Sequence, residues 1–111
     1  MTAVSAITNH AELAMGDLYR LVRQIPPGKV ASYGWLGKQL GQSPRLVGRY
    51  LHHNPDSTQT PCHRVIHADG TLAGGYAFGG RSVQRQLLVK EGVLFTKERV
   101  VRSAFMDSAK K

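Results

Sequence analysis

The pattern with the strongest structural consequence is a pair of short helices separated by a glycine turn. Ser32 is a favourable N-cap for a helix over residues 33–40, and Gly41 stands immediately after its end. Ser43 is a favourable N-cap for a second helix over residues 44–53, which begins with proline, a residue favoured at the first helical position. Two capped helices joined by so short a turn predict a helix-turn-helix unit.

The second helix of this pair has a basic face. Arg45, Gly48, Arg49 and His52 recur at helical spacing and form one stripe, while apolar residues occupy the opposite side. A glycine inside a helix costs about 0.5–1 kcal/mol relative to alanine, so its place in the stripe favours close approach of a bulky group such as a sugar-phosphate backbone. The alternative is a solvated basic face with an incidental glycine. A formal charge of +8, from 15 Lys and Arg against 7 Asp and Glu, favours an anionic partner, nucleic acid before a membrane surface.

The remaining sequence predicts one domain of mainly helical α/β class. The 111 residues contain no repeat and no internal linker. The other expected elements are a helix capped by Asn9 and ending near residue 23, a strand within 61–66, a turn over 67–70, a glycine-rich loop over 74–80, a helix over 82–91 and a hairpin pairing 93–95 with 99–101. Residues 1–9 and 107–111 are expected to be flexible. Because the chain has neither a long apolar run nor a signal-peptide pattern, we expect a cytoplasmic location without membrane contact.

Cys62 is the only cysteine, so an internal disulfide and a zinc finger built on cysteine pairs are excluded. A cysteine reacts as the thiolate, and its ordinary pKa of about 8.5 requires activation at neutral pH. His63 and Arg64 are suitable neighbours, although the alternation of side chains along a strand favours a bridging water between Cys62 and His63. Glu91, at the end of an apolar helix, is the candidate to orient the imidazole. The alternative is a buried structural cysteine, and no ligand cluster indicates a metal site.

Four motifs occur in a fixed order along the chain. They are Ser32-Tyr33-Gly34, Arg45-Leu46-Val47-Gly48, Asn54-Pro55 followed by Pro61-Cys62-His63-Arg64-Val65, and Leu87-Leu88-Val89-Lys90-Glu91-Gly92. In this order they resemble the DNA-binding domain of O6-alkylguanine-DNA alkyltransferases, from about Leu18 to Phe95. The resemblance implies a winged helix-turn-helix-like domain with small β elements, whose partner is double-stranded DNA containing O6-alkylguanine.

The resemblance also implies a set of reactive residues. Cys62 would accept the alkyl group after activation through a water by His63, with Glu91 holding the imidazole. Asn54 would brace the turn packed against the cysteine segment, and Tyr33 would crowd the target phosphate and offer its hydroxyl proton to the purine. The base must leave the stack, because a protein sulfur cannot reach the alkyl carbon in line inside a duplex. Since ordinary hydrolysis does not cleave the thioether product, the protein would act once, without a cofactor or a metal.

The expected contacts with DNA follow from the same resemblance. Arg45 would enter the base stack from the minor groove and take the place of the flipped guanine. The main-chain carbonyls of Cys62 and Val65 would recognise the guanine amino group. The other expected DNA contacts are Ser43, Gly48, Arg49 and Tyr33, and the expected walls of the substrate pocket are Pro61, Val65, Tyr76, Phe78 and Gly79.

Several positions depart from the family pattern and leave other functions open. Arg49 replaces a small residue, Gln84 stands where lysine is common, Phe78 replaces a smaller residue, and Ser57 stands where members that accept benzyl groups carry proline. The chain is expected to be a monomeric one-domain form. One-domain alkyltransferase-like proteins, which commonly carry tryptophan in place of the cysteine, bind and flip the lesion without repairing it and signal to nucleotide-excision-repair proteins. A transcription-regulating helix-turn-helix module is a third possibility, but no dimerisation helix is evident.

Overall fold

Four helices and two small sheets make up the described part of the chain. The structure is a computed structural model that describes residues 10–54, 59–72, 76 and 78–106. Its elements are α2 (His10–Arg23), β1 (Ala31–Ser32), α3 (Tyr33–Leu40), α4 (Pro44–His52), η1 (Cys62–Arg64), β2 (Val65–Ile66), α5 (Gly80–Lys90), β3 (Phe95–Thr96), β4 (Arg99–Val100) and η2 (Arg102–Ala104). Asn9, Ser57, residues 73–75 and 77 of the glycine-rich loop, and the ends over 1–9 and 107–111 lie outside the described residues. No helix in these ranges is long and apolar enough to cross a bilayer.

The caps of the helix pair form as the sequence predicts. The Ser32 hydroxyl accepts a hydrogen bond from the backbone N–H of Trp35 at the start of α3. The Ser43 hydroxyl accepts one from the N–H of Leu46 at the start of α4. Each serine satisfies a backbone donor that the helix itself leaves without a partner, which explains why both helices begin where they do.

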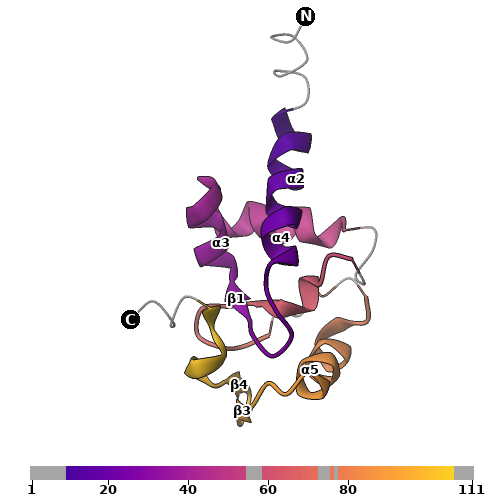
Figure 1. Cartoon of the computed structure of the whole chain (residues 1–111), viewed down its shortest axis with the longest axis vertical. Coiled ribbons are helices and arrows are strands. Elements are labelled where there is room, and N and C mark those ends of the chain that lie inside the picture. The colour runs from indigo at the N-terminus through magenta and orange to yellow at the C-terminus, as the bar shows by residue number, and fades with distance from the viewer. Residues whose placement is uncertain (1–9, 55–58, 73–75, 77, 107–111) are drawn as a thin grey trace, which may run out of the picture.

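The turn between α3 and α4 depends on two glycines. Gly41 ends α3 with a φ of 69°, in the left-handed region that glycine adopts without strain. A Cβ atom on Gly37 would lie 2.4 Å from the carbonyl oxygen of Gln42, so only glycine permits this close approach. The two helices therefore pack directly against each other, with α2 alongside (Figure 1).

A two-residue parallel sheet joins two hydrophobic cores. β1 pairs with β2, which brings Ala31 opposite Val65 and Ser32 opposite Ile66. Successive residues of a strand face opposite sides, and here Ala31 and Val65 belong to the core formed with α2, α3 and α4. Ile66 belongs to the second core, formed with α5, the β3–β4 hairpin and η2. The helix-turn-helix and the C-terminal elements are thus packed on the two faces of one small sheet (Figure 1).

Several element boundaries differ from the sequence prediction. The strand expected within 61–66 forms at its β-branched end, Val65–Ile66, and is preceded by a 3-10 turn over Cys62–Arg64 that the sequence did not predict. The hairpin is shorter than predicted, with Phe95 opposite Val100 and Thr96 opposite Arg99. The last helix runs from Gly80 to Lys90 rather than over 82–91, and α4 ends at His52, one residue early. Helix ends are the least determined part of a sequence pattern, since the terminal residues have few packing partners.

Candidate functional site

The Cys62 thiol is buried at the start of the 3-10 turn. Its side chain is 6% exposed and belongs to the core shared with the helix pair. The side-chain amide of Asn54, just after α4, donates to the Thr60 carbonyl at 2.8 Å and to Cys62 Sγ at 3.4 Å. Burial raises the pKa of the Cys62 thiol, and the hydrogen bond from Asn54 opposes this effect without cancelling it. The sulfur is therefore protonated at neutral pH, and a reaction needs a group that removes this proton.

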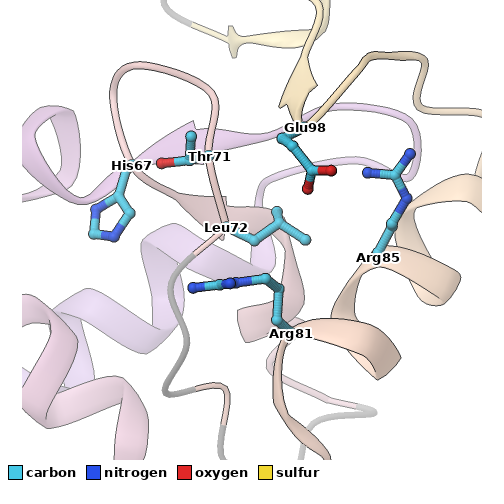
Figure 2. Close-up of a pocket in the computed structure, with 6 residues that line it drawn as sticks. All are labelled: His67, Thr71, Leu72, Arg81, Arg85 and Glu98. Carbon is cyan, nitrogen blue, oxygen red and sulfur yellow. The ribbon is translucent and has the colours of Figure 1, made fainter.

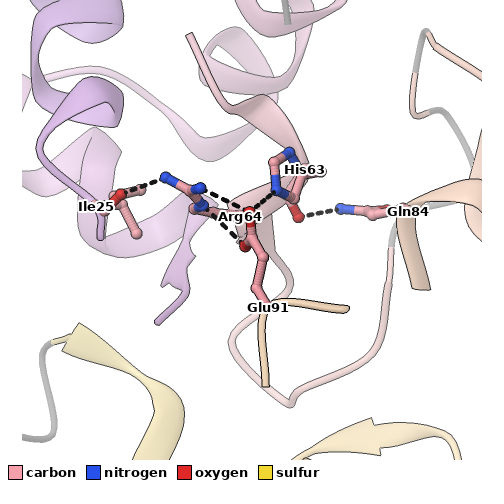
Figure 3. Close-up of polar contacts among 5 residues, drawn as sticks. All are labelled: Ile25, His63, Arg64, Gln84 and Glu91. Atoms are coloured by element: carbon pink, nitrogen blue, oxygen red, sulfur yellow. Dashed lines mark hydrogen bonds and ion pairs between the residues drawn. The ribbon is translucent and has the colours of Figure 1, made fainter. Parts of the chain in front are cut away.

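The 3-10 turn carries His63 and Arg64 to the same carboxylate, that of Glu91 at the C-terminal end of α5. His63 Nε2 lies 3.0 Å from Glu91 Oε2. Arg64 donates to both carboxylate oxygens, with Nε 3.0 Å from Oε1 and Nη2 2.6 Å from Oε2. Arg64 Nη1 also donates to the carbonyl oxygen of Ile25 at 2.7 Å (Figure 3). The Glu91 carboxylate thus ties the cysteine turn to the end of α5, and Arg64 ties the same turn to the segment after α2.

This network fixes the protonation state of the imidazole. Burial raises the pKa of Glu91, but hydrogen bonds from Arg64 and His63 outweigh it, and the pKa is lowered overall. An ionised carboxylate only accepts hydrogen bonds, so His63 Nε2 carries the proton and donates it to Glu91. Burial lowers the pKa of His63, against the raising effect of Glu91, so the imidazole is neutral at neutral pH. Its Nδ1 atom is buried and has no hydrogen-bond partner among the residues that the structure describes, so it is the nitrogen that can accept a proton.

Gln84 is a buried polar residue whose role the sequence did not reveal. It is 1% exposed, and its Nε2 donates to the carbonyl oxygen of His63 at 3.0 Å (Figure 3). The same Nε2 donates to the carbonyl oxygen of Val65 at 3.1 Å. It therefore ties α5 to the backbone of the cysteine turn. The Val65 carbonyl, expected to recognise a guanine amino group, already accepts one hydrogen bond, and a carbonyl oxygen has a second lone pair. Gln84 lies one helical turn before buried Leu88, a spacing that marks the core face of α5.

A small cavity brings several of the predicted site residues together. Its volume is about 20 Å³, and its lining residues are Tyr33, Gly48, Leu51, His52, Cys62, Tyr76 and Gln84. Burial, together with the nearby Cys62 thiol, raises the pKa of Tyr33 to about 12. The phenol therefore remains a hydrogen-bond donor at neutral pH. A Cβ atom on Gly48 would lie 3.7 Å from the Tyr33 ring, so this glycine sits directly beside the tyrosine as well as on the exposed stripe.

Other predicted pocket residues lie around a second cavity or at the surface. Pro61 lines a different cavity, of about 450 Å³, together with His63, Tyr76 and Glu91. Phe78 is 36% exposed, and its ring centroid lies 5.8 Å from that of Tyr76. Gly79 has a φ of 132° and precedes α5, where a Cβ atom would lie 2.6 Å from Val83. Its conformation and this close approach explain why a glycine stands there, independently of any ligand.

The basic stripe of α4 forms as predicted. Arg45, Arg49 and His52 are exposed, while Val47 and Leu51 on the opposite side are buried. The neighbouring Ser43 hydroxyl is exposed and caps the helix. Two residues of the stripe, Gly48 and His52, line the Cys62 cavity together with Tyr33. A basic helix face thus leads directly to a buried thiol.

Comparison with known proteins places these features in a family. The sequence model described as "6-O-methylguanine DNA methyltransferase, DNA binding domain" matches residues 15–93. A Thermus thermophilus protein named DNA base-flipping protein is 49% identical over 77 residues, which cover 69% of this chain and 51% of that protein. The methylated-DNA–protein-cysteine methyltransferase of Pyrobaculum aerophilum is 42% identical over 88 residues, which cover 78% of this chain and 58% of that protein. The chain thus spans just over half the length of these two curated relatives.

A solved structure matches over most of both chains. S. pombe Atl1, in complex with damaged DNA containing O6-carboxymethylguanine, superposes with a TM-score of 0.67 at 31% sequence identity, covering 80% of this chain and 86% of Atl1. The family match includes the helix pair, the cysteine turn and α5, which are the elements that build the site. The chain therefore belongs to the family of the 6-O-methylguanine DNA methyltransferase DNA-binding domain.

Proposed function

We propose that this chain is a DNA-repair protein that flips O6-alkylguanine out of duplex DNA through the minor groove and transfers the alkyl group to Cys62. The observation that carries the proposal is the arrangement at the cysteine turn. Cys62 receives a hydrogen bond from Asn54, and the next residue is a neutral histidine held by Glu91. A buried thiol beside a base and a positioning carboxylate is the arrangement that nucleophilic catalysis requires. The names of the methyltransferase relatives support the same reaction.

In the proposed transfer, each step is carried out by one of these residues. His63 Nδ1 takes the thiol proton through a water, and the sulfur attacks the alkyl carbon of the lesion. A C–S bond forms while the C–O6 bond breaks, and its electron pair stays on the purine. Tyr33, protonated because its pKa is about 12, donates a proton to the purine, and the proton held by His63 restores the phenol through solvent. The thiol has lost one proton and guanine has gained one. Since water does not cleave a thioether under these conditions, each protein molecule reacts once.

The size of the Cys62 cavity adds a conformational requirement. A volume of about 20 Å³ holds about one water molecule and cannot hold a purine. A flipped base therefore needs more room than this cavity offers, and Tyr76 is the lining residue that precedes α5 in the chain rather than belonging to a helix or strand. Binding of a flipped base is therefore coupled to a local opening beside the thiol.

A second candidate function is a damage sensor that binds and flips O6-alkylguanine without efficient repair and signals to excision repair. The specific observation in its favour is the raised pKa of the buried Cys62 thiol, which slows attack unless His63 removes the proton. The similarity to Atl1 and to the base-flipping protein of Thermus thermophilus also supports it. The two functions share DNA binding and base flipping, and they differ only in transfer to the sulfur.

Intact-protein mass spectrometry distinguishes the two functions. After incubation with a duplex containing O6-methylguanine, we expect the protein mass to rise by one methylene, located on the peptide that contains Cys62. The matched control is the same duplex with unmodified guanine, which should leave the mass unchanged. An unchanged mass with tight lesion binding would establish the sensor instead. An unchanged mass without any preference for the lesion would contradict both functions and favour a transcriptional regulator.

Replacing Arg45 with alanine tests the flipping step. Because Arg45 is exposed at the start of α4, beside the helix turn, its loss should weaken lesion binding about tenfold while leaving binding to undamaged duplex nearly unchanged. Arg49, one turn further along the same face, still supplies a phosphate contact. The matched control is Arg49→Ala, which should weaken binding to both duplexes equally. An equal loss for both duplexes in Arg45→Ala, measured by fluorescence anisotropy, would mean that Arg45 is only a phosphate anchor.

A further inference from the structure

A separate cavity of about 350 Å³ lies beside α5, outside the thiol site. Its lining residues are His67, Thr71, Leu72, Arg81, Arg85 and Glu98 (Figure 2). They come from three places, namely the turn after β2, the first half of α5 and the turn of the β3–β4 hairpin. Leu72 is buried and lies in the middle of the group, while the polar side chains surround it. The cavity is therefore a charged hollow with a small apolar floor.

Two arginines give this cavity an excess of positive charge. Arg81 and Arg85 are one helical turn apart on α5, a spacing at which like charges repel and destabilise a helix. Among the residues that the structure describes, neither of them forms an ion pair. Glu98 is the one acidic residue that lines the cavity, and it forms no ion pair there either. The cavity thus concentrates cationic groups that no carboxylate neutralises by contact.

Arg85 is held in place rather than free in solvent. Its guanidinium carbon lies 4.1 Å from the centre of the Phe95 ring, a cation–π contact. Its Nη1 donates a long hydrogen bond of 3.4 Å to the carbonyl of Lys97. Arg81 is exposed, and its guanidinium extends under Leu72 toward the His67 side (Figure 2). The guanidinium groups of Arg85 and Arg81 are well suited to bind an oxyanion, because each presents several hydrogen-bond donors in one plane.

The cavity adjoins the thiol site through two aromatic rings. The His67 ring centroid lies 5.5 Å from that of Tyr33, and Tyr33 lines the Cys62 cavity. Tyr33 also lies next to Gly48 of α4, the helix that carries the basic stripe. Tyr33 is therefore a neighbour of both the arginine cavity and the α4 stripe. A strand that places one nucleotide at the thiol opening brings neighbouring phosphates near both.

We propose that Arg81, Arg85 and His67 form a second DNA contact, which binds a backbone phosphate flanking the nucleotide at the thiol opening. The duplex would then be held at two points, the α4 stripe and this arginine cavity. A second contact resists rotation of the protein about the first one and helps hold the strand while a base leaves the stack. This proposal depends on the proposed function in one respect, namely that the ligand is DNA. It does not require alkyl transfer.

The salt dependence of binding tests the contact. We expect Arg81→Gln combined with Arg85→Gln to weaken binding to an undamaged duplex and to reduce the magnitude of the slope of log K against log salt by about one, since about one counterion is released per phosphate contact. The matched control is Lys90→Gln, which removes an exposed charge from the last turn of the same helix, outside the cavity. It should leave the slope unchanged. Arg81→Lys combined with Arg85→Lys keeps both charges and should restore the slope, which separates loss of charge from loss of fold.

Methylphosphonate groups, which replace a charged phosphate by an uncharged one, show where on the DNA the contact lies. In a lesion duplex with single methylphosphonate substitutions on either side of the target, we expect wild-type binding to fall about tenfold at one flanking position in addition to those that face α4. The double glutamine variant should be insensitive at that position and normal at the others. A variant with the same salt slope and the same methylphosphonate profile as wild type would overturn the proposal. Failure of the proposed function has a different signature, namely no lesion preference and no mass gain in the wild type, with the slope difference intact.

Discussion

Cys62→Ser should abolish alkyl transfer while keeping binding to a duplex containing O6-methylguanine within about threefold of wild type. A serine hydroxyl is far less acidic than a thiol, so a neutral His63 cannot generate the nucleophile at neutral pH. The fold should persist, because the change is nearly isosteric and the Asn54 amide that donates to Sγ can donate to the new hydroxyl. Intact mass reports transfer, and anisotropy reports binding. We therefore expect no mass gain at any time and a stable complex with the lesion.

The comparison variant for this experiment is Cys62→Ala, which keeps the small volume but leaves Asn54 Nδ2 with one acceptor fewer. It should also show no transfer, and its unfolding free energy should fall by about 1–2 kcal/mol more than that of the serine variant. A mass gain in either variant would mean that another side chain accepts the alkyl group. Loss of lesion binding in a folded serine variant would mean that the thiol contributes to recognition itself.

Glu91→Gln should have the second-largest effect, lowering the rate of transfer about 100-fold and the unfolding free energy by about 2–3 kcal/mol. The substitution leaves Arg64 mostly buried without its carboxylate partner and removes the charge that favours the Nε2-protonated imidazole. Single-turnover kinetics measures the rate, and thermal unfolding measures stability, with an expected fall in Tm of about 10 °C or more. The matched control is Asp17→Asn, which removes an acidic charge from the exposed Asp17–Arg20 pair on α2. It should change stability by less than about 0.5 kcal/mol and leave the rate unchanged.

The pH dependence separates positioning of His63 from loss of stability. Wild-type transfer should fall as the pH drops through the pKa of His63, which lies below its ordinary value of about 6.5. Glu91 raises the pKa of His63, so Glu91→Gln should move this acid limb to lower pH. The pKa of Glu91 is lowered in the folded state, so its stabilising effect is present above about pH 4.3 and is lost as the pH falls through its folded pKa. The stability difference between wild type and variant should shrink in that range, and a constant difference would contradict the network.

The sequence predicts the helix pair well because its determinants are local. A capping serine contacts a backbone N–H three residues away, and a glycine after α3 needs no distant partner. The exposed stripe of α4 follows from helical periodicity alone. The family resemblance adds the cysteine turn and its carboxylate, and the structure brings His63 and Glu91 into contact across 28 positions of the chain. Their chemical roles stay predictions until the variants are measured.

The features that the sequence did not predict depend on long-range contacts. The 3-10 turn at Cys62 arises where Asn54 holds the Thr60 carbonyl and Arg64 reaches Glu91 and Ile25. None of these partners is adjacent in the sequence, and the β-branched residues that follow favour a strand. From the sequence, Arg64 is only a positive charge near the cysteine. In the structure, its guanidinium donates hydrogen bonds to both carboxylate oxygens of Glu91. From the sequence, Gln84 is only a position where lysine is common in the family. In the structure, its side-chain amide donates hydrogen bonds to the carbonyl oxygens of His63 and Val65.

The two-residue pairing of β1 with β2 has a consequence for how such a protein can diversify. Tyr33 follows β1 directly, and the turn that carries Cys62 precedes β2 directly, so the pairing of Ala31 with Val65 sets the spacing between phenol and sulfur. That spacing depends on main-chain hydrogen bonds, which surface substitutions leave intact. Exposed residues on α4 or around the arginine cavity can therefore change with little effect on the distance between the Tyr33 phenol and the Cys62 sulfur. The exposed surface can diverge while the geometry of the buried site stays the same.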